Sequence, residues 1–197
     1  MNRAAIEFAA AAAQEYRFSS ETFVRSGKVN AAATAKGTRH NHDYAAHLKN
    51  LGEENELLDA SQMQALCGSE YYQSGLYTPG TAMLQPALYA REMAAGLATQ
   101  NVTFFENSPV VELNRNGPVW SAKTMRGSVE APKIILTVNG HVESFGFFKR
   151  RLMHLYLYAS MTHALTKDEQ KRLDGSPIWA FTPADPMGTT LRKIGGI

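Results

Sequence analysis

The sequence predicts an α+β or α/β fold built around a mixed β-sheet. Helical and strand-like segments alternate along the chain, and turn signals such as Asn116-Gly117 separate the strand-like ones. Of the 197 residues, 44% are hydrophobic and 19% are charged, which is an ordinary globular mixture. This length is enough for one medium core or two small ones.

The first hundred residues are predicted to contain several helices. Residues 4–16 are rich in alanine, which favours a helix by intrinsic propensity. Residues 38–51 have apolar side chains at helical spacing, and Gly52 is expected to follow that helix as its C′ residue. Pro86 suits the first turn of a further helix, because a proline there removes no helical hydrogen bond.

Shorter elements are expected between these helices. Asp59 or Ser61 is expected to cap a short helix that Gly68 ends. Residues 71–84 are rich in glycine, tyrosine and proline, so a loop or hairpin is expected there. Tyr71, Tyr72 and Tyr77 within that stretch are either binding residues on a loop or fillers of a loop core. Short strands are expected at 21–25 and 28–33.

The second half of the chain is predicted to consist mainly of strands. Residues 133–138 are apolar and β-branched, as expected for a strand buried on both faces. Residues 152–164 alternate apolar and polar side chains with a period of two, which predicts a long strand. Further strands are expected at 102–105, 110–113, 119–124 and within 179–192, with a polar helix at 167–173 that begins after Thr166.

The charge and cysteine content exclude several classes of protein. A net charge of +2 is too small to indicate a nucleic-acid surface, and no apolar run is long enough to predict a membrane span. The single cysteine, Cys67, excludes an intramolecular disulfide and fits a reducing compartment, so a cytoplasmic protein is expected. The pair His40 and His42 is interpreted as a polar helix start, and no metal site is expected.

Several segments, in their order and spacing, carry a resemblance to a known family. They are residues 27–34, 57–59, 75–79, 84–86, 105–110, 135–140 and 179–188. Together they resemble the D-amino-acid-oxidase-like flavoproteins of the glycine oxidase and sarcosine oxidase type. The nearest likeness is to the γ-glutamylputrescine oxidases.

The resemblance implies a division into parts. Residues 1–100 correspond to the helical and strand part of a substrate domain, 101–142 to middle strands of a partial FAD-binding domain, and 143–197 to the substrate-domain sheet. The sequence contains no GxGxxG loop, which in such enzymes holds the FAD pyrophosphate. The chain is therefore expected to be a truncated, central piece of such a protein.

The resemblance also implies residues that contact FAD. Val110 matches a position whose backbone meets the adenine, although an ordinary buried valine fits the sequence equally well. Thr137, Asn139 and Gly140 match a strand end close to the dinucleotide, where a glycine lets the backbone approach the ligand. The alternative for Asn139-Gly140 is a simple turn.

The implied reaction is FAD-dependent oxidation of the C–N bond of an amine, such as a γ-glutamyl polyamine. Tyr156, Tyr158 and His154 would lie on one face of the predicted strand and hold the amine, or would form only the wetter side of a sheet. No catalytic residue is assigned.

The sequence also fits two alternatives to a working enzyme. In the first, the chain is a non-catalytic binding protein or subunit that has lost FAD. In the second, it is a subunit that completes an FAD site together with a partner chain. Without the elements that cover it, the apolar run 134–138 would be exposed, so self-association is also expected.

Overall fold

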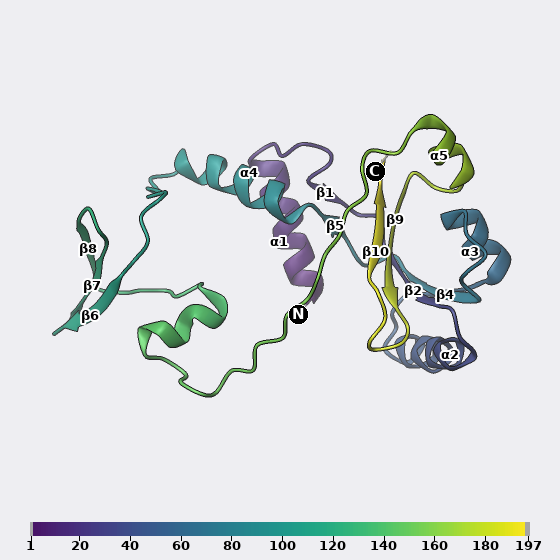
Figure 1. The fold of residues 1–197 in the computed structure, drawn as a ribbon, viewed down its shortest axis with the longest axis horizontal. Helices are drawn as coiled ribbons and strands as arrows, with labels where there is room; N and C mark the ends of the chain where they lie inside the picture. The colour runs from purple at the N-terminus through teal and green to yellow at the C-terminus, as the bar shows by residue number, and fades with distance from the viewer. Residues whose placement is uncertain (1, 196–197) are drawn as a thin grey trace. The chain divides into compact units, whose positions relative to one another are not determined.

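The computed structural model describes residues 2–195, which divide into two compact units. One unit contains the residues up to Asn101 together with those from Met161 onward, and the other contains Val102–Ser160. The interpretation of parts of the chain as FAD-binding and substrate domains stays a prediction. Figure 1 shows the elements of both units.

The first unit is organised around a five-stranded sheet with the order β10-β9-β2-β4-β3. Strands β2 and β9 pair in parallel and all other neighbours pair antiparallel, so the expected mixed sheet is confirmed. The pairing of β2 with β9 joins segments about 150 residues apart in sequence. The strands are β2 (Lys28–Ala32), β3 (Glu56–Asp59), β4 (Ser74–Thr78), β9 (Ile178–Pro183) and β10 (Leu191–Ile194).

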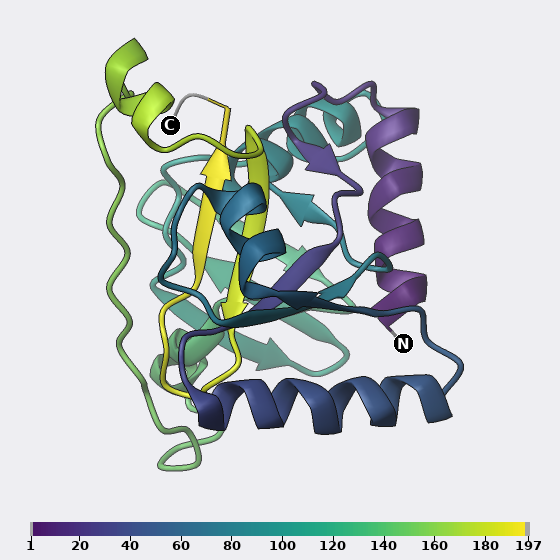
Figure 2. The same cartoon turned by 90° about the vertical axis from the view of Figure 1, so that its right-hand side faces the viewer.

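Helices α2 (Ala35–Asn50) and α3 (Ala60–Cys67) cover opposite faces of this sheet. Figure 2 views the sheet from the β3 edge, with α3 above the strand and α2 below it. Alternate strand residues therefore enter two separate cores. The α3 face contains Val29, Ala31, Met63, Cys67 and Phe181, and the α2 face contains Ala45, Leu48 and Leu76.

Capping residues explain the ends of these helices, and α2 begins three residues before the predicted start at 38. Thr34 caps α2 by accepting a 3.0 Å hydrogen bond from the backbone N–H of Gly37. Asp59 and Gln62 form a capping box at the start of α3, and Gly68 ends that helix in the left-handed conformation. Gly52 follows α2 with a φ of 70°.

Helices α1 (Asn2–Glu15) and α4 (Pro86–Ala98) also belong to the first unit, and both confirm predicted helices. Strands β1 (Phe23–Val24) and β5 (Met83–Leu84) pair with each other beside them. The fully buried Thr22 donates a 2.5 Å hydrogen bond to Glu92 on α4, which ties the segment after α1 to that helix. Phe18 packs edge-to-face on Tyr89.

The second unit contains an antiparallel three-stranded sheet, β6-β7-β8. Gly117, with a φ of 62°, forms the predicted hairpin turn between the first two of these strands. The strands are β6 (Glu112–Asn116), β7 (Val119–Lys123) and β8 (Ser128–Ala131), and a 3-10 helix, η1 (Asn139–Phe145), follows them. In residues 2–195, no helix is both long and apolar enough to cross a bilayer.

Three predicted strands are wrong, since residues 102–105, 133–138 and 152–164 form no regular element. Ile135 is 87% exposed and Leu157 is 91% exposed, so neither segment is buried. Apolar period and β-branching indicate that a segment suits a sheet, but a strand forms only where a partner strand supplies the hydrogen bonds. Neither of these two segments pairs with any strand of the described chain.

The loop predicted for residues 71–84 is also corrected. Residues Ser74–Thr78 form β4, which lies between β2 and β3 near the middle of the sheet. Gly75 fits this buried strand because Met63 and Val29 occupy the space where a side chain would lie. Glycine here marks close packing, not a turn.

Candidate functional site

The residues predicted to contact FAD lie in the second unit. Val110 precedes β6 in irregular structure and is 39% exposed, which does not match a buried valine. Thr137 is exposed in the irregular segment before η1. Asn139 and Gly140 begin η1, with Asn139 in the left-handed region at a φ of 51°.

The structure brings one of these residues next to a predicted substrate residue. A Cβ atom placed on Gly140 would lie 2.7 Å from Nε2 of His154, so the imidazole ring occupies the space beside the glycine. The same Nε2 atom lies 3.8 Å from a carboxylate oxygen of Glu143. The other oxygen of Glu143 accepts a 2.7 Å hydrogen bond from the backbone N–H of Arg150.

The two predicted substrate tyrosines do not join this cluster. Tyr156 is 84% exposed and Tyr158 is fully exposed in the extended segment after His154. Neither side chain has a hydrogen-bond partner in the part of the chain that the structure describes. The predicted set of His154, Tyr156 and Tyr158 therefore does not form a closed binding site within this unit.

A polar network on the α2 face of the large sheet was not predicted. The Lys28 ammonium donates a 2.9 Å hydrogen bond to Oδ1 of Asn30, and the Thr182 hydroxyl donates to the same oxygen at 2.7 Å. Asn41 on α2 is fully buried and donates to the backbone carbonyl of Asn30 at 2.8 Å. Half-burial of Lys28 lowers the pKa of its ammonium group.

The sequence held only a weak signal for this network. Lys28 and Asn30 are polar residues two positions apart on one face of a strand, and their partner Thr182 lies far along the chain. Only the pairing of β2 with β9 reveals that they meet. The Oδ1 atom of Asn41 is buried without a hydrogen-bond partner among the described residues.

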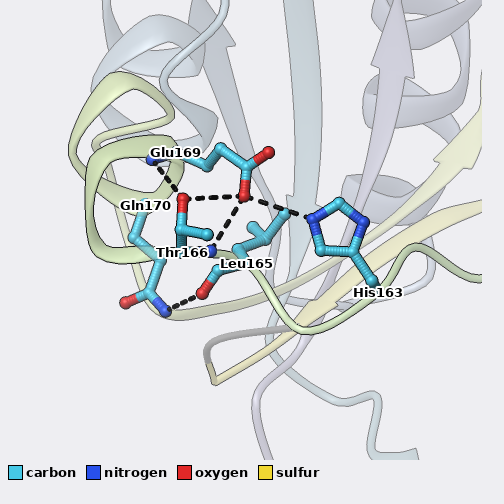
Figure 3. Close-up of polar contacts among 5 residues, drawn as sticks. All are labelled: His163, Leu165, Thr166, Glu169 and Gln170. Atoms are coloured by element: carbon cyan, nitrogen blue, oxygen red, sulfur yellow. Dashed lines mark hydrogen bonds and ion pairs between the residues drawn. The ribbon is translucent and has the colours of Figure 1, made fainter.

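A second polar cluster, drawn in Figure 3, stabilises the start of α5 (Lys167–Arg172). The Glu169 carboxylate accepts hydrogen bonds from the backbone N–H and the hydroxyl of Thr166, and lies 3.3 Å from His163. The backbone hydrogen bond from Thr166 is the main cause of the lowered Glu169 pKa. The cluster is a capping box at the predicted helix start, and its exposed position indicates a structural role.

The comparisons with known proteins identify the class of protein. Residues 1–195 match the family described as FAD dependent oxidoreductase, of the D-amino-acid-oxidase type. The chain therefore belongs to this family of FAD-dependent oxidoreductases. The mixed sheet and the helices on it agree with the fold of family members.

A curated relative and several solved structures are similar to this chain. It is 32% identical over 97 residues to a probable oxidoreductase, OrdL, of Haemophilus influenzae, across 48% of this chain and 22% of that protein. It is 16% identical to glycine oxidase from Geobacillus kaustophilus, with a TM-score of 0.57 over 66% of this chain and 36% of the other. It is 12% identical to L-proline dehydrogenase from P. horikoshii, with a TM-score of 0.59 over 72% and 38%.

A further structural neighbour is NikD, an unusual amino acid oxidase essential for nikkomycin biosynthesis. The chain is 16% identical to it, with a TM-score of 0.54 over 72% of this chain and 36% of that one. The matches thus cover only about a third of the lengths of these solved structures. At these identities the structural likeness shows the fold alone.

The described residues do not by themselves fit FAD, although the family depends on it. No glycine-rich loop is present in the sequence to hold the pyrophosphate. Gly140 offers no open backbone for the dinucleotide, because the His154 ring fills the space beside it. Thr137 and Asn139 are exposed and form no cradle.

Proposed function

We propose that this protein takes part in the oxidation of the C–N bond of an amine or amino acid, as part of an FAD-dependent oxidoreductase. The match to the family over residues 1–195 is the observation that carries the proposal. The large mixed sheet would supply the substrate side of the enzyme. A partner chain would supply the site for the FAD pyrophosphate, since this sequence contains no glycine-rich loop for it.

The proposal includes the contacts to FAD and to the substrate that the sequence predicts. Val110, Thr137, Asn139 and Gly140 would contribute to the dinucleotide side once the pyrophosphate site is complete. For Gly140 this requires that the His154 ring, which fills the space beside the glycine, moves away. His154, Tyr156 and Tyr158 would contribute to the substrate side. The Glu143 carboxylate beside His154 supports a positioned imidazole, since an acidic neighbour favours the ring orientation that places Nε2 toward it.

A γ-glutamyl polyamine is the substrate that we propose to test first. The support is the likeness of the segments at 27–34, 75–79 and 179–188 to γ-glutamylputrescine oxidases. A panel should also contain glycine, proline and sarcosine, because similar proteins carry the names glycine oxidase and proline dehydrogenase. We further propose that the protein works in the cytoplasm, which its single cysteine supports.

The experiment uses affinity-tagged chain isolated from the cells that produce it. We expect a flavin-containing partner to copurify and the preparation to reduce a dye only when an amine of the panel is added. A flavin-containing preparation that oxidises no amine of a broad panel would refute the reaction. Recovery of the chain alone, colourless and inactive with added FAD, would favour a non-catalytic binding protein.

We also propose that the chain self-associates through the extended segment of its second unit. Met153, Leu155 and Leu157 are each at least 78% exposed, and such a run of exposed apolar side chains is typical of a contact surface. Light scattering after size-exclusion chromatography should show a dimer or larger species. A monodisperse monomer at the highest soluble concentration would contradict self-association.

A further inference from the structure

A groove of about 410 Å³ lies on the α3 face of the large sheet. Strand register places Glu56 of β3 directly opposite Tyr77 of β4, and Tyr77 opposite Val29 of β2, so these three side chains form one row across the sheet. Trp179 of β9 lines the same groove, and Leu66 of α3 contributes to its wall. The groove thus combines one carboxylate with two aromatic rings and apolar side chains.

The two aromatic rings are held in place by the surrounding structure. Gly27 has a φ of 67°, and a Cβ atom on it would lie 2.6 Å from the Tyr77 hydroxyl, so the ring packs directly against the glycine backbone. The Tyr77 hydroxyl also donates a 3.3 Å hydrogen bond to the carbonyl of Ser26. The Trp179 ring stacks on the buried Phe181 at a centroid distance of 4.2 Å.

The Glu56 carboxylate is available for a ligand. It makes no hydrogen bond and no ion pair with any residue among 2–195. Lys28 is the one cationic residue among the described residues that line the groove. Its ammonium group bonds to Asn30 and Thr182 on the opposite face of the sheet. The negative charge in the groove is therefore not neutralised by the protein.

We propose that this groove binds a small organic ammonium ion. The ammonium group would pair with the Glu56 carboxylate and lie close to the rings of Tyr77 and Trp179, because aromatic faces attract cations. The alkyl part of the ligand would pack on Leu58 and Leu66, and this contact would remove apolar surface from water. This site lies within the first unit, and it does not depend on FAD or on the proposed oxidation.

The test measures the fluorescence of Trp179 in the full chain. A Trp120→Phe background removes the only other tryptophan, which belongs to the second unit. The probe is n-butylammonium chloride, compared at constant ionic strength with n-butanol and sodium butyrate. We expect a saturable change with n-butylammonium only, and an affinity about tenfold lower in Glu56→Gln.

Glu54→Gln is the matched control, since Glu54 is also an exposed carboxylate on the same segment but does not line the groove. It should bind n-butylammonium as the background does. An equal response to n-butanol, a response that does not saturate, or equal losses in the Glu56 and Glu54 variants would overturn the proposal. Circular dichroism of each variant confirms that it is folded before titration.

Discussion

The packing of β4 against α3 gives a quantitative prediction for the core. A methyl group at Gly75 would overlap the sulfur of Met63 and lie 2.6 Å from Cγ1 of Val29. Met63 is fully buried and Val29 is 3% exposed, so neither has open space into which it can move. Overpacking of this kind costs about 1–3 kcal/mol, and we expect Gly75→Ala to lower the free energy of unfolding by that amount.

A second substitution tests whether this overlap is the cause. Met63→Ala alone should cost about 2–5 kcal/mol, because it leaves a cavity in the α3-face core. In the double variant the new methyl group enters the space that Met63 vacates. The combined cost should therefore be smaller than the sum of the single costs by about 0.5–3 kcal/mol.

The assay is urea unfolding followed by Trp179 fluorescence in the Trp120→Phe background. Trp179 packs against the cluster that contains Met63, so its emission reports this core. Gly80→Ala serves as the control, since nothing lies within 4 Å of a Cβ atom placed there. Additive costs in the double variant, or an equal loss from Gly80→Ala, would refute the packing argument.

Three further predictions concern polar groups. Asn41→Ala should lower the free energy of unfolding by about 1–3 kcal/mol in the same assay, because it removes a buried donor to the Asn30 carbonyl; an unchanged value would contradict this role. Burial lowers the pKa of Lys28 in the folded chain, so between the folded pKa and the unfolded value near 10.5 the unfolded chain binds more protons. The free energy of unfolding should therefore rise with pH across this window, and Lys28→Met should flatten that rise. A hydrogen bond from the Gln62 backbone lowers the pKa of Asp59 in the folded chain. The carboxylate therefore stabilises the fold above the unfolded pKa of 3.8, and this stabilisation is lost as the pH falls through the folded pKa. Asp59→Asn, which can still cap α3, should remove this acid dependence of unfolding, measured by far-UV circular dichroism.

Local sequence signals predicted the helices of this chain well. The capping residues Thr166 and Asp59, the terminating Gly68 and the helix-starting Pro86 each act within a few residues of the backbone groups that they satisfy. Such contacts do not depend on the rest of the fold. They can therefore be read from a short stretch of sequence.

The strands were harder to predict, because a strand depends on a partner distant in sequence. The runs at 133–138 and 152–164 have the composition of strands, yet they have no partner among the described residues. The pairing of β2 with β9, which assembles Lys28, Asn30 and Thr182, was equally invisible in the local pattern. The groove beside Glu56 was missed for the same reason, since four strands and one helix bring its lining together.

This chain belongs to a family of FAD-dependent oxidoreductases, yet we expect that its described residues alone do not hold the cofactor. Equilibrium dialysis of the purified 197-residue chain against FAD tests it most directly. We predict no saturable retention of flavin by the folded chain. Stoichiometric retention of FAD, lost in a Gly140→Trp variant that remains folded, would contradict the claim and would show a cofactor site within these residues.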